Sequence, residues 1–485
     1  MELNQLTIRE VHEKLQSGEI SSLDLVNACI ERIKKTDKKL HCFLATDFDN
    51  AIKQAKEVDK KIKKGGKLKI LEGIPCGIKD LILTKGITTT ASSKMLENYV
   101  PLFDATVIKR LKDNGAIILG KHNCDAWGHG GSTENSDYGP SHNPWDLERV
   151  PGGSSGGSAA STASDQVIYS LGTDTGGSIR CPASHCGCVG FKPTYGRVPR
   201  FGTIAMGSSL DTIGPIAKCV DDAAIILNII AGLDPKDSTT LPKEVPDYTK
   251  MKDKGVKGLT IGLPKEAFGK GLQPEVKSLM QIAIRDLEKL GAKFKEVSLK
   301  YLDYGLACYY IIMPSEVSSN LGRYDGIRYG HQSKEADNLF EIYTKSRAEG
   351  FGAEAKRRIM IGTYVLSAGY YDAYYKKAMQ VRTLIKEDFE KVLSEVDLIL
   401  MPTSPRPAFK IGENVNDPLT MYLEDIYTVT INMAGVPAAS IPCGFVNNLP
   451  VGMQLIAKQF GEEKIFQAAY AYEAINGWNR IKPKI

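Results

Sequence analysis

Histidine is scarce in this sequence: only 7 of the 485 residues are histidine, whereas 46 are glycine. Hydrolases with a nucleophilic serine commonly use a histidine as the base. Downstream of the Gly- and Ser-rich segment 151-PGGSSGGSAAS-161 the sequence offers only His185 and His331, and neither lies in a recognisable triad motif. A hydrolytic site in this chain would therefore need another base.

Other features are missing as well. No stretch reaches the roughly 18 uninterrupted apolar residues of a membrane span. The N-terminus has no hydrophobic leader with a cleavage site, so we expect the ten cysteines to be reduced thiols of a cytoplasmic protein. The segment 181-CPASHCGC-188 has no second, distant pair of ligands, and we therefore predict no bound metal.

The composition is that of a globular enzyme, with 42% hydrophobic and 25% charged residues. The net charge of +5 is small for this length, and Lys-rich runs such as 60-KKIKKGGK-67 are typical of solvated helix ends. Charge alone therefore neither requires nor excludes an RNA partner.

Hydrophobic periodicity predicts an α/β fold. Ser21 and Ser22 can cap a helix with apolar residues from Leu25 to Ile33 at helical spacing, and a second helix through Ile52 to Ile62 ends near Gly65. Pro274 to Leu290 is a third. Short apolar runs predict buried strands at 115–120, 167–172, 259–264, 397–402 and 438–443. The Pro-, Lys- and Asp-rich stretch 239–257 is the best candidate for a linker.

Segment 151–161 has several possible interpretations. A flexible linker would not lead so directly into a predicted strand, and the Lys and Ser/Thr of a P-loop are absent, although a small-molecule kinase loop remains possible. A G-x-S-x-G match lacks the strand that should precede it. A buried lysine could replace histidine as base. Lys79 lies in the apolar segment 71–83, but on its own it is more typical of a strand-end lysine that reaches solvent.

Four motifs in order, 73-GIPCGIKD-80, 151-PGGSSGGSAA-160, 172-GTDTGGSIRCPA-183 and 190-GFKPTYGRV-198, resemble the amidase signature family, as does the 24-residue interval between two serines. The resemblance implies a three-layer α/β/α fold around a large central mixed sheet. It also implies one domain, 1–485, with an N-terminal helical region (about 1–65), a catalytic core (about 66–240 and 395–485) and a helical middle region (about 258–394).

The same resemblance implies the site. The family's triad is a nucleophilic serine, a serine preceded by a cis peptide bond and a lysine, which correspond here to Ser178, Ser154 and Lys79. Backbone N–H groups of Thr175, Gly176 and Gly177 would form the oxyanion hole.

Within the family, segments such as 132-STENS-136, 323-RYDGIRYG-330, 357–375 and 421–429 resemble the glutaminase subunits of tRNA-dependent amidotransferases. This implies glutamine as substrate, bound by Tyr309, Arg358 and Asp425. It also implies a heterotrimer with a B subunit, which would use ATP and Mg²⁺ and bind the charged tRNA, and a small C subunit. No cofactor is expected on this chain.

The sequence departs from that pattern in 125-DAWGHGGSTEN-135, where Trp127 and His129 could alter the rim of the pocket, and at Cys181, where glutamine is usual. Two alternatives stay open. One is a stand-alone amidase acting on small or aryl amides, and the other is a scaffold without activity, which the intact Lys79, Ser154 and Ser178 oppose.

Overall fold

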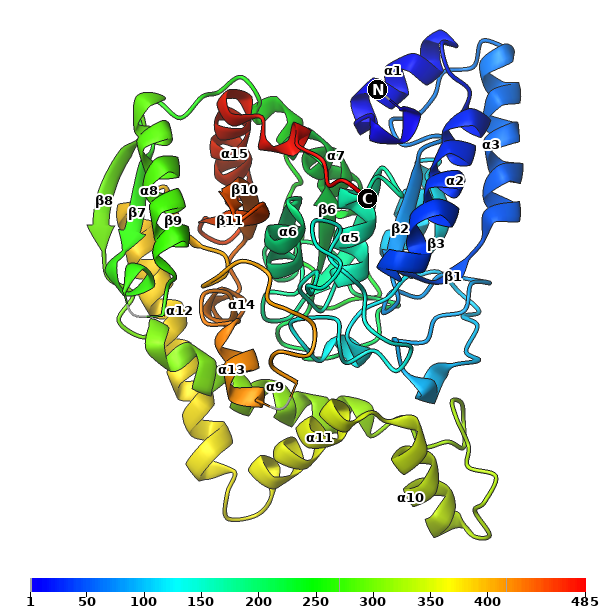
Figure 1. Ribbon diagram of the computed structural model, residues 1–485. Coiled ribbons are helices and arrows are strands. Elements are labelled where there is room, and N and C mark those ends of the chain that lie inside the picture. The colour runs from blue at the N-terminus through cyan, green and yellow to red at the C-terminus, as the bar shows by residue number, and fades with distance from the viewer. Residues whose placement is uncertain (1, 270, 416) are drawn as a thin grey trace.

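A single mixed β-sheet forms the centre of the molecule in the computed structural model, which describes residues 2–269, 271–415 and 417–485 (Figure 1). Its eleven strands lie in the order β1-β3-β2-β4-β6-β5-β10-β11-β9-β7-β8. They are β1 (Phe43–Thr46), β2 (Pro75–Lys79), β3 (Ile117–His122), β4 (Tyr169–Asp174), β5 (Val189–Lys192), β6 (Thr212–Ala217), β7 (Thr260–Pro264), β8 (Lys293–Val297), β9 (Leu398–Pro402), β10 (Ala438–Val446) and β11 (Leu449–Ile456).

The described helices are α1 (Ile8–Ser17), α2 (Ser22–Leu40), α3 (Phe48–Lys63), α4 (Thr106–Asp113), α5 (Gly156–Ala163), α6 (Arg180–Cys186), α7 (Val220–Ile230), α8 (Pro274–Lys289), α9 (Gly305–Leu321), α10 (Leu339–Gly350), α11 (Ala353–Leu366), α12 (Lys377–Glu395), α13 (Pro418–Leu423), α14 (Val429–Ala434) and α15 (Glu462–Asn476). None of the helices in the described ranges is long and apolar enough to cross a membrane.

Strand direction divides the sheet into zones. Strands β3, β2 and β4 are mutually parallel, as are β8, β7 and β9 at the other end. Between them, β6, β5, β10 and β11 pair in antiparallel fashion, and β1 adds an antiparallel edge. The predicted three-layer α/β/α fold around a mixed sheet is therefore confirmed.

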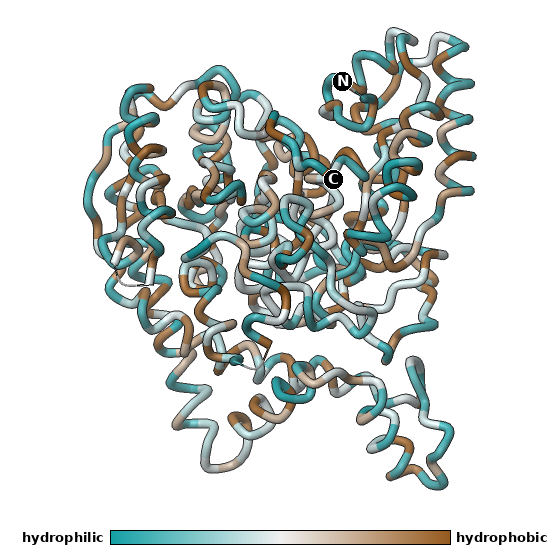
Figure 2. The backbone as a smooth tube through the Cα atoms, viewed as in Figure 1, coloured by the Kyte–Doolittle hydropathy of each residue, from teal (hydrophilic) through white to brown (hydrophobic). Residues whose placement is uncertain are grey.

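Each face of the sheet has its own hydrophobic core. On one face α2, α3, α5 and α6 cover residues such as Ile117 and Leu119 of β3. On the other face α4, α7, α8 and α15 pack with Ile118 of β3 and Tyr169 of β4. Adjacent residues of one strand thus enter different cores, because side chains alternate across a sheet. Figure 2 shows hydrophobic and hydrophilic residues alternating along the outer helices, α3 among them.

The predicted elements are largely confirmed. Ser21 is the N-cap of α2, where its side chain accepts a hydrogen bond from the N–H of Asp24. The predicted strands correspond to β3, β4, β7, β9 and β10, with ends displaced by a few residues. The helical middle region also contributes β7 and β8, which extend the same sheet. The three-part division of the domain remains a prediction.

The expected linker at 239–257 is wrong. Tyr248 within it is fully buried, and its ring lies 5.1 Å from that of Phe466 on α15. Tyr248 therefore anchors this Pro- and Lys-rich segment in the hydrophobic core.

The stacked pair of Phe191 on β5 and Phe466 on α15, with ring centroids 4.5 Å apart, provides a test of this core. We expect Phe191→Ala to lower the free energy of unfolding by about 3–5 kcal/mol, because it leaves a cavity in a fully packed interior. Urea denaturation measures the loss. Phe340→Ala is the control, since that side chain is 76% exposed, and it should change stability by less than about 0.5 kcal/mol.

Candidate active site

Lys79 ends β2, which has a parallel strand on each side. Its side chain is fully buried, and its Nζ donates hydrogen bonds to Ser154 Oγ at 2.7 Å and to Thr173 Oγ1 at 2.8 Å. Burial lowers the pKa of Lys79 to about 8, and nearby groups such as Asp125 and Asp174 only partly oppose this. The interpretation of Lys79 as a strand-end lysine that reaches solvent is therefore wrong. A buried amine with a lowered pKa can be neutral near physiological pH and can then accept a proton.

Ser154 is preceded by a cis peptide bond to Gly153, as the resemblance implied. It lies just before α5, a helix built wholly of Gly, Ala, Ser and Thr and completely buried. A Cβ at Gly157 would come within 2.5 Å of the carbonyl oxygen of Asn123. Small residues therefore let the helix start lie directly on the chain after β3, which brings Ser154 to Lys79.

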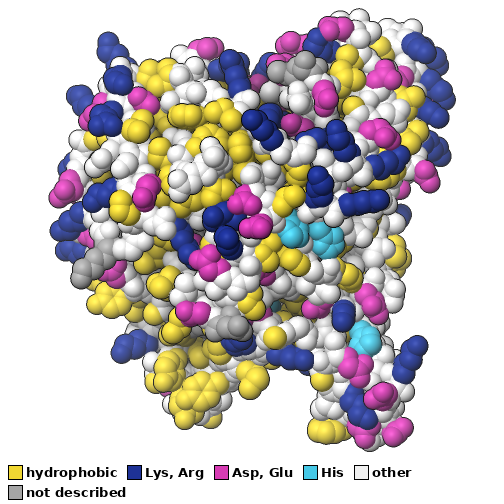
Figure 3. Space-filling model, viewed as in Figure 1, with side chains coloured by type: hydrophobic (Ala, Val, Ile, Leu, Met, Phe, Trp, Pro, Cys, Tyr) yellow, Lys and Arg dark blue, Asp and Glu magenta, His cyan; other side chains and the backbone are white. Residues whose placement is uncertain are grey.

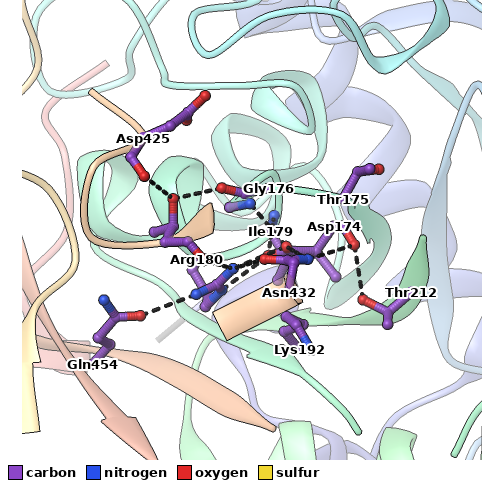
Figure 4. Close-up of polar contacts among 12 residues, drawn as sticks. Asp174, Thr175, Gly176, Ile179, Arg180, Lys192, Thr212, Asp425, Asn432 and Gln454 are labelled. Carbon is purple, nitrogen blue, oxygen red and sulfur yellow. Dashed lines mark hydrogen bonds and ion pairs between the residues drawn. The ribbon is translucent and has the colours of Figure 1, made fainter. Parts of the chain in front are cut away.

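Ser178 lies in a tight turn between β4 and α6 that is organised by a buried ion pair (Figure 4). Asp174 accepts hydrogen bonds from the N–H groups of Gly177 (2.9 Å) and Ile179 (3.1 Å). Arg180 binds the same carboxylate through Nε and Nη2. Although burial opposes it, the Arg180 guanidinium holds the pKa of Asp174 well below its ordinary value.

The positive φ of 137° at Gly177 favours glycine, and a Cβ there would meet Thr428 Oγ1 at 2.4 Å. Ser178 itself is 8% exposed, so its hydroxyl lies at the edge of the buried region. Among the described residues, Ser154 Oγ and Ser178 Oγ do not form a hydrogen bond with each other.

The three backbone N–H groups predicted to form the oxyanion hole are not all free. The N–H of Gly177 is bound to Asp174, so it is not free to face a substrate oxygen in this arrangement. The N–H groups of Thr175 and Gly176 have no acceptor among the described residues. The carbonyl of Gly176 accepts a hydrogen bond from Thr428 Oγ1 (2.5 Å), which fixes the orientation of that peptide.

The three predicted substrate-binding residues lie close to one another. Tyr309 on α9 is buried against Gly176, where a Cβ would meet its hydroxyl at 2.6 Å. Arg358 on α11 is 3% exposed, and its Nε binds Glu354 Oε1 at 2.8 Å. Asp425 Oδ2 accepts the hydroxyl of Tyr310 at 2.9 Å, and burial raises the pKa of Asp425 to about 7.

Tyr310 joins these groups, since its ring also lies 5.6 Å from the guanidinium carbon of Arg358. A cavity of about 70 Å³ opens here, lined by residues that include Gly130, Gly131, Tyr310 and Arg358. Arg358 thus lines the cavity, and Asp425 lies next to it, since a Cβ on Gly131 would be 3.9 Å from Asp425 Oδ1.

The departures from the family pattern have different consequences. Trp127 is fully buried against Tyr324 and Phe351, with ring centroids 4.5 and 5.4 Å away, so it is a core residue. His129 is buried too, and desolvation together with Arg358 lowers its pKa well below the ordinary value. Burial raises the pKa of the Cys181 thiol to about 12, so this cysteine is inert near the nucleophile turn.

Sequence reasoning missed several residues of the site. Asp174 and Arg180 stand within the quoted motif 172–183, but their pairing depends on the fold of the turn. Thr173, Tyr310 and Asp211 carried no separate signal. Thr173 lies inside the motif 172–183 and Tyr310 directly follows Tyr309, so position in the sequence could have suggested both. Asp211 meets Thr175 only through the fold.

Comparisons with known proteins agree with this geometry. A model of the family described as Amidase matches residues 24–466. The A subunit of the glutamyl-tRNA(Gln) amidotransferase of Thermoanaerobacter pseudethanolicus is 55% identical over 484 residues, covering 100% of this chain and 99% of that one. Its counterpart in Carboxydothermus hydrogenoformans is 53% identical over all of both chains.

Solved structures extend the likeness. The crystal structure of the glutamyl-tRNA(Gln) amidotransferase A subunit from Thermotoga maritima has a TM-score of 0.80 and 43% identity, covering 98% of this chain and 96% of that one. A bacterial aryl acylamidase of the amidase signature family has a TM-score of 0.85 at 27% identity, covering 98% and 97%. With a family match over most of its length and full-length relatives above 50% identity, this chain belongs to the amidase signature family.

Proposed function

We propose that this chain hydrolyses glutamine and acts as the glutaminase subunit of a tRNA-dependent amidotransferase. The observation that carries the catalytic part is the hydrogen bond between a fully buried lysine, Lys79, and Ser154, beside the Ser178 turn. A lysine without solvent, and with a lowered pKa, is suited to remove a proton through the serine it contacts.

The proposed reaction has two halves. Ser178 Oγ attacks the side-chain amide carbon of glutamine, while its proton passes through Ser154 to neutral Lys79. The relay then returns that proton to the departing nitrogen, the C–N bond breaks and ammonia leaves. Water attacks the resulting glutamyl ester and gives a proton to Lys79 by the same route. The ester C–O bond then breaks, the relay returns that proton to Ser178 Oγ, and glutamate leaves. Catalytic hydrogen bonds often tighten only when substrate is bound, so the Ser154 to Ser178 link would form at that stage.

Charge on the carbonyl oxygen would be stabilised by the N–H groups of Thr175 and Gly176. Each such donor is worth about 3 kcal/mol in acyl transfer. Gly177, also expected in this role, would contribute only after releasing Asp174. Its N–H instead fixes the shape of the turn.

Substrate selection would depend on Arg358 and Asp425, with Tyr309 forming the wall between them and the nucleophile turn. The guanidinium would bind the α-carboxylate of glutamine, and the ionised carboxylate would bind its ammonium. Tyr310 holds Asp425 from one side and lies beside Arg358 on the other.

The subunit role rests on relatives of 53–55% identity, each named as the A subunit of an amidotransferase. The sequence has no P-loop, so activation of tRNA-bound glutamate would fall to a B subunit that uses ATP and Mg²⁺ and binds the charged tRNA. A small C subunit would complete a cytoplasmic heterotrimer. This chain itself would need no cofactor.

An exposed aromatic patch supports assembly with partners. It lies at the end of α11 and in the turn to α12, and Figure 3 shows hydrophobic side chains gathered there, at the lower left. Its members are Met360, Ile361, Tyr364, Tyr370, Tyr371 and Tyr374, each between 37% and 72% exposed. Patches of this kind usually mark protein interfaces.

Co-expression with the B and C subunits of the same organism tests the proposal. Purified through a tag on this chain, the complex should convert Glu-tRNA(Gln) to Gln-tRNA(Gln) with glutamine as nitrogen donor. Ser178→Ala should abolish glutamine-dependent product, yet product should return when ammonium chloride replaces glutamine. If the chain stays alone and hydrolyses aryl amides faster than glutamine, it is a stand-alone amidase, as the aryl acylamidase likeness would allow.

A pH profile tests the role of Lys79. Only the neutral amine accepts a proton, and its pKa is lowered to about 8, so kcat/KM should fall about tenfold for each pH unit below that value. Lys79→Arg should be inactive at every pH, because arginine stays protonated. Substantial activity of that variant, or a rate independent of pH between 6 and 8, would contradict the mechanism.

Substrate discrimination tests Arg358. Arg358→Ala should reduce kcat/KM for glutamine by about 10–100-fold, the usual value of a charged hydrogen bond, and change hydrolysis of an anilide without α-carboxylate by less than about threefold. Asp425→Ala should behave similarly through the ammonium. Lys356→Ala is the matched control, because Lys356 is an exposed cation on the same helix, α11, and lies outside the lining of this cavity. Equal losses on both substrates would mean that the two residues are structural.

A further inference from the structure

A second buried carboxylate, Asp211, lies directly behind the proposed oxyanion hole. It immediately precedes β6, whose first residue, Thr212, is paired with Asp174 at the end of β4. Its side chain is 7% exposed and accepts three hydrogen bonds, from Thr175 Oγ1 (2.6 Å) and from the N–H groups of Met206 (2.9 Å) and Gly207 (3.1 Å). No cation among the described residues forms an ion pair with it.

This arrangement is unusual for a buried acid. Carboxylates that leave water without an ionic partner are costly, and burial raises the pKa of Asp211 to about 6 even with three donors present. Asp174, which pairs in the sheet with Thr212, the residue after Asp211, is balanced by Arg180. A buried acid without an ionic partner at this position is therefore a candidate for a functional residue.

We propose that Asp211 is a positioning residue for amide hydrolysis, which holds Thr175 so that the backbone N–H groups of Thr175 and Gly176 face the developing oxyanion. The proposal rests on the catalytic assignments above but applies to any amide that Ser178 attacks.

The contacts along the turn support this role. Each of three consecutive residues has one polar anchor: Thr175 is bound by Asp211, the carbonyl of Gly176 by Thr428, and the N–H of Gly177 by Asp174. Gly176 and Gly177 have no side chains with which to fix themselves. Without the hydrogen bond to Asp211, Thr175 would be free to move, and its N–H is one of the two proposed to stabilise the oxyanion.

Packing does not replace this anchor. A cavity of about 180 Å³ borders Thr175 and Asp211 and is lined further by Met206, Ser208 and Arg200. Packing around Thr175 is therefore incomplete on this side, and the hydrogen bond to Asp211 is the polar contact that orients its hydroxyl.

Asp211 is itself held from the other side. The loop 206–209, which supplies two of its donors, is fixed to the helical region: Asn320 on α9 donates to the carbonyl of Met206 (2.9 Å), and Arg382 on α12 donates to that of Ser209 (2.9 Å). Asp211 thus connects Thr175 to a loop that the helices α9 and α12 hold in place. Hole donors need placement to within about 0.5 Å, which requires such support.

A double-mutant cycle tests the proposal. In Asp211→Asn the amide would direct a donor toward a backbone N–H of the loop, and in Thr175→Val the hydroxyl is replaced by a methyl of similar shape. We expect each single variant to lower kcat about 10–100-fold with KM changed less than twofold, because the hole acts in the transition state. The double variant should be no slower than the worse single, because both remove one contact.

Measurements use the full chain, in its complex if one forms, with both glutamine and an anilide as substrates. Asp222→Asn is the matched control: Asp222 is also fully buried and accepts a backbone N–H, that of Ile8, but it lies outside the site. Its variant should lose stability, seen as a lower melting temperature, without a comparable loss of kcat.

The proposal is overturned if the losses of kcat in the two single variants multiply in the double variant. It is also overturned if either single variant keeps a kcat within threefold of wild type. If Asp211→Asn does not fold, Thr175→Val decides alone by the same threshold. The two substrates separate this inference from the proposed function. Loss of kcat on the anilide by a chain that does not use glutamine would support Asp211 and refute the glutaminase, whereas an active Ser178→Ala variant would refute the catalytic assignment itself.

Discussion

The buried ion pair of Asp174 and Arg180 is the interaction on which the active site depends. Both side chains are fully buried, and Arg180 also binds Gln454 of β11 and Asn432 of α14. The pair thereby connects the end of β4 to elements from the C-terminal part of the chain (Figure 4). Removing either partner would leave an unbalanced charge in the interior, at a cost of about 3–5 kcal/mol. The Gly-rich turn that carries Ser178 keeps its shape because Asp174, held by Arg180, binds the backbone N–H groups of Gly177 and Ile179.

The contact between Lys79 and Ser154, on which the proposed proton relay rests, depends on close approach. Lys79 lies at the end of a central strand, and Ser154 reaches it because every residue of α5 is small enough for that helix to lie almost against the sheet. The same closeness excludes water from the lysine, which lowers its pKa. Packing and acid–base chemistry therefore have one cause, and a larger side chain in α5 would disturb both.

The chemical and selective parts of the site come from different regions. Strands and turns of the sheet supply the lysine and both serines, whereas Tyr309 and Arg358 come from the helices α9 and α11. The solved relatives fit this division, since an amidotransferase subunit and an aryl acylamidase share the fold at TM-scores of 0.80 and 0.85. Under the proposed assignments, a change in the helical region would alter substrate binding while Lys79, Ser154 and Ser178 keep their places.

The sequence by itself determined the α/β fold class and five of the eleven strands, and its motifs pointed to Lys79, Ser154 and Ser178 as candidate catalytic residues, because local periodicity and ordered motifs are properties of the chain alone. Only the tertiary structure decided which groups they meet. Burial of Lys79, the capture of the Gly177 N–H by Asp174, the placement of Trp127 in the core and the contact of Asp211 with Thr175 all join residues through the folded sheet. Hydrogen bonds and desolvation act through space, and for that reason a motif could name candidate catalytic residues but not their partners or protonation.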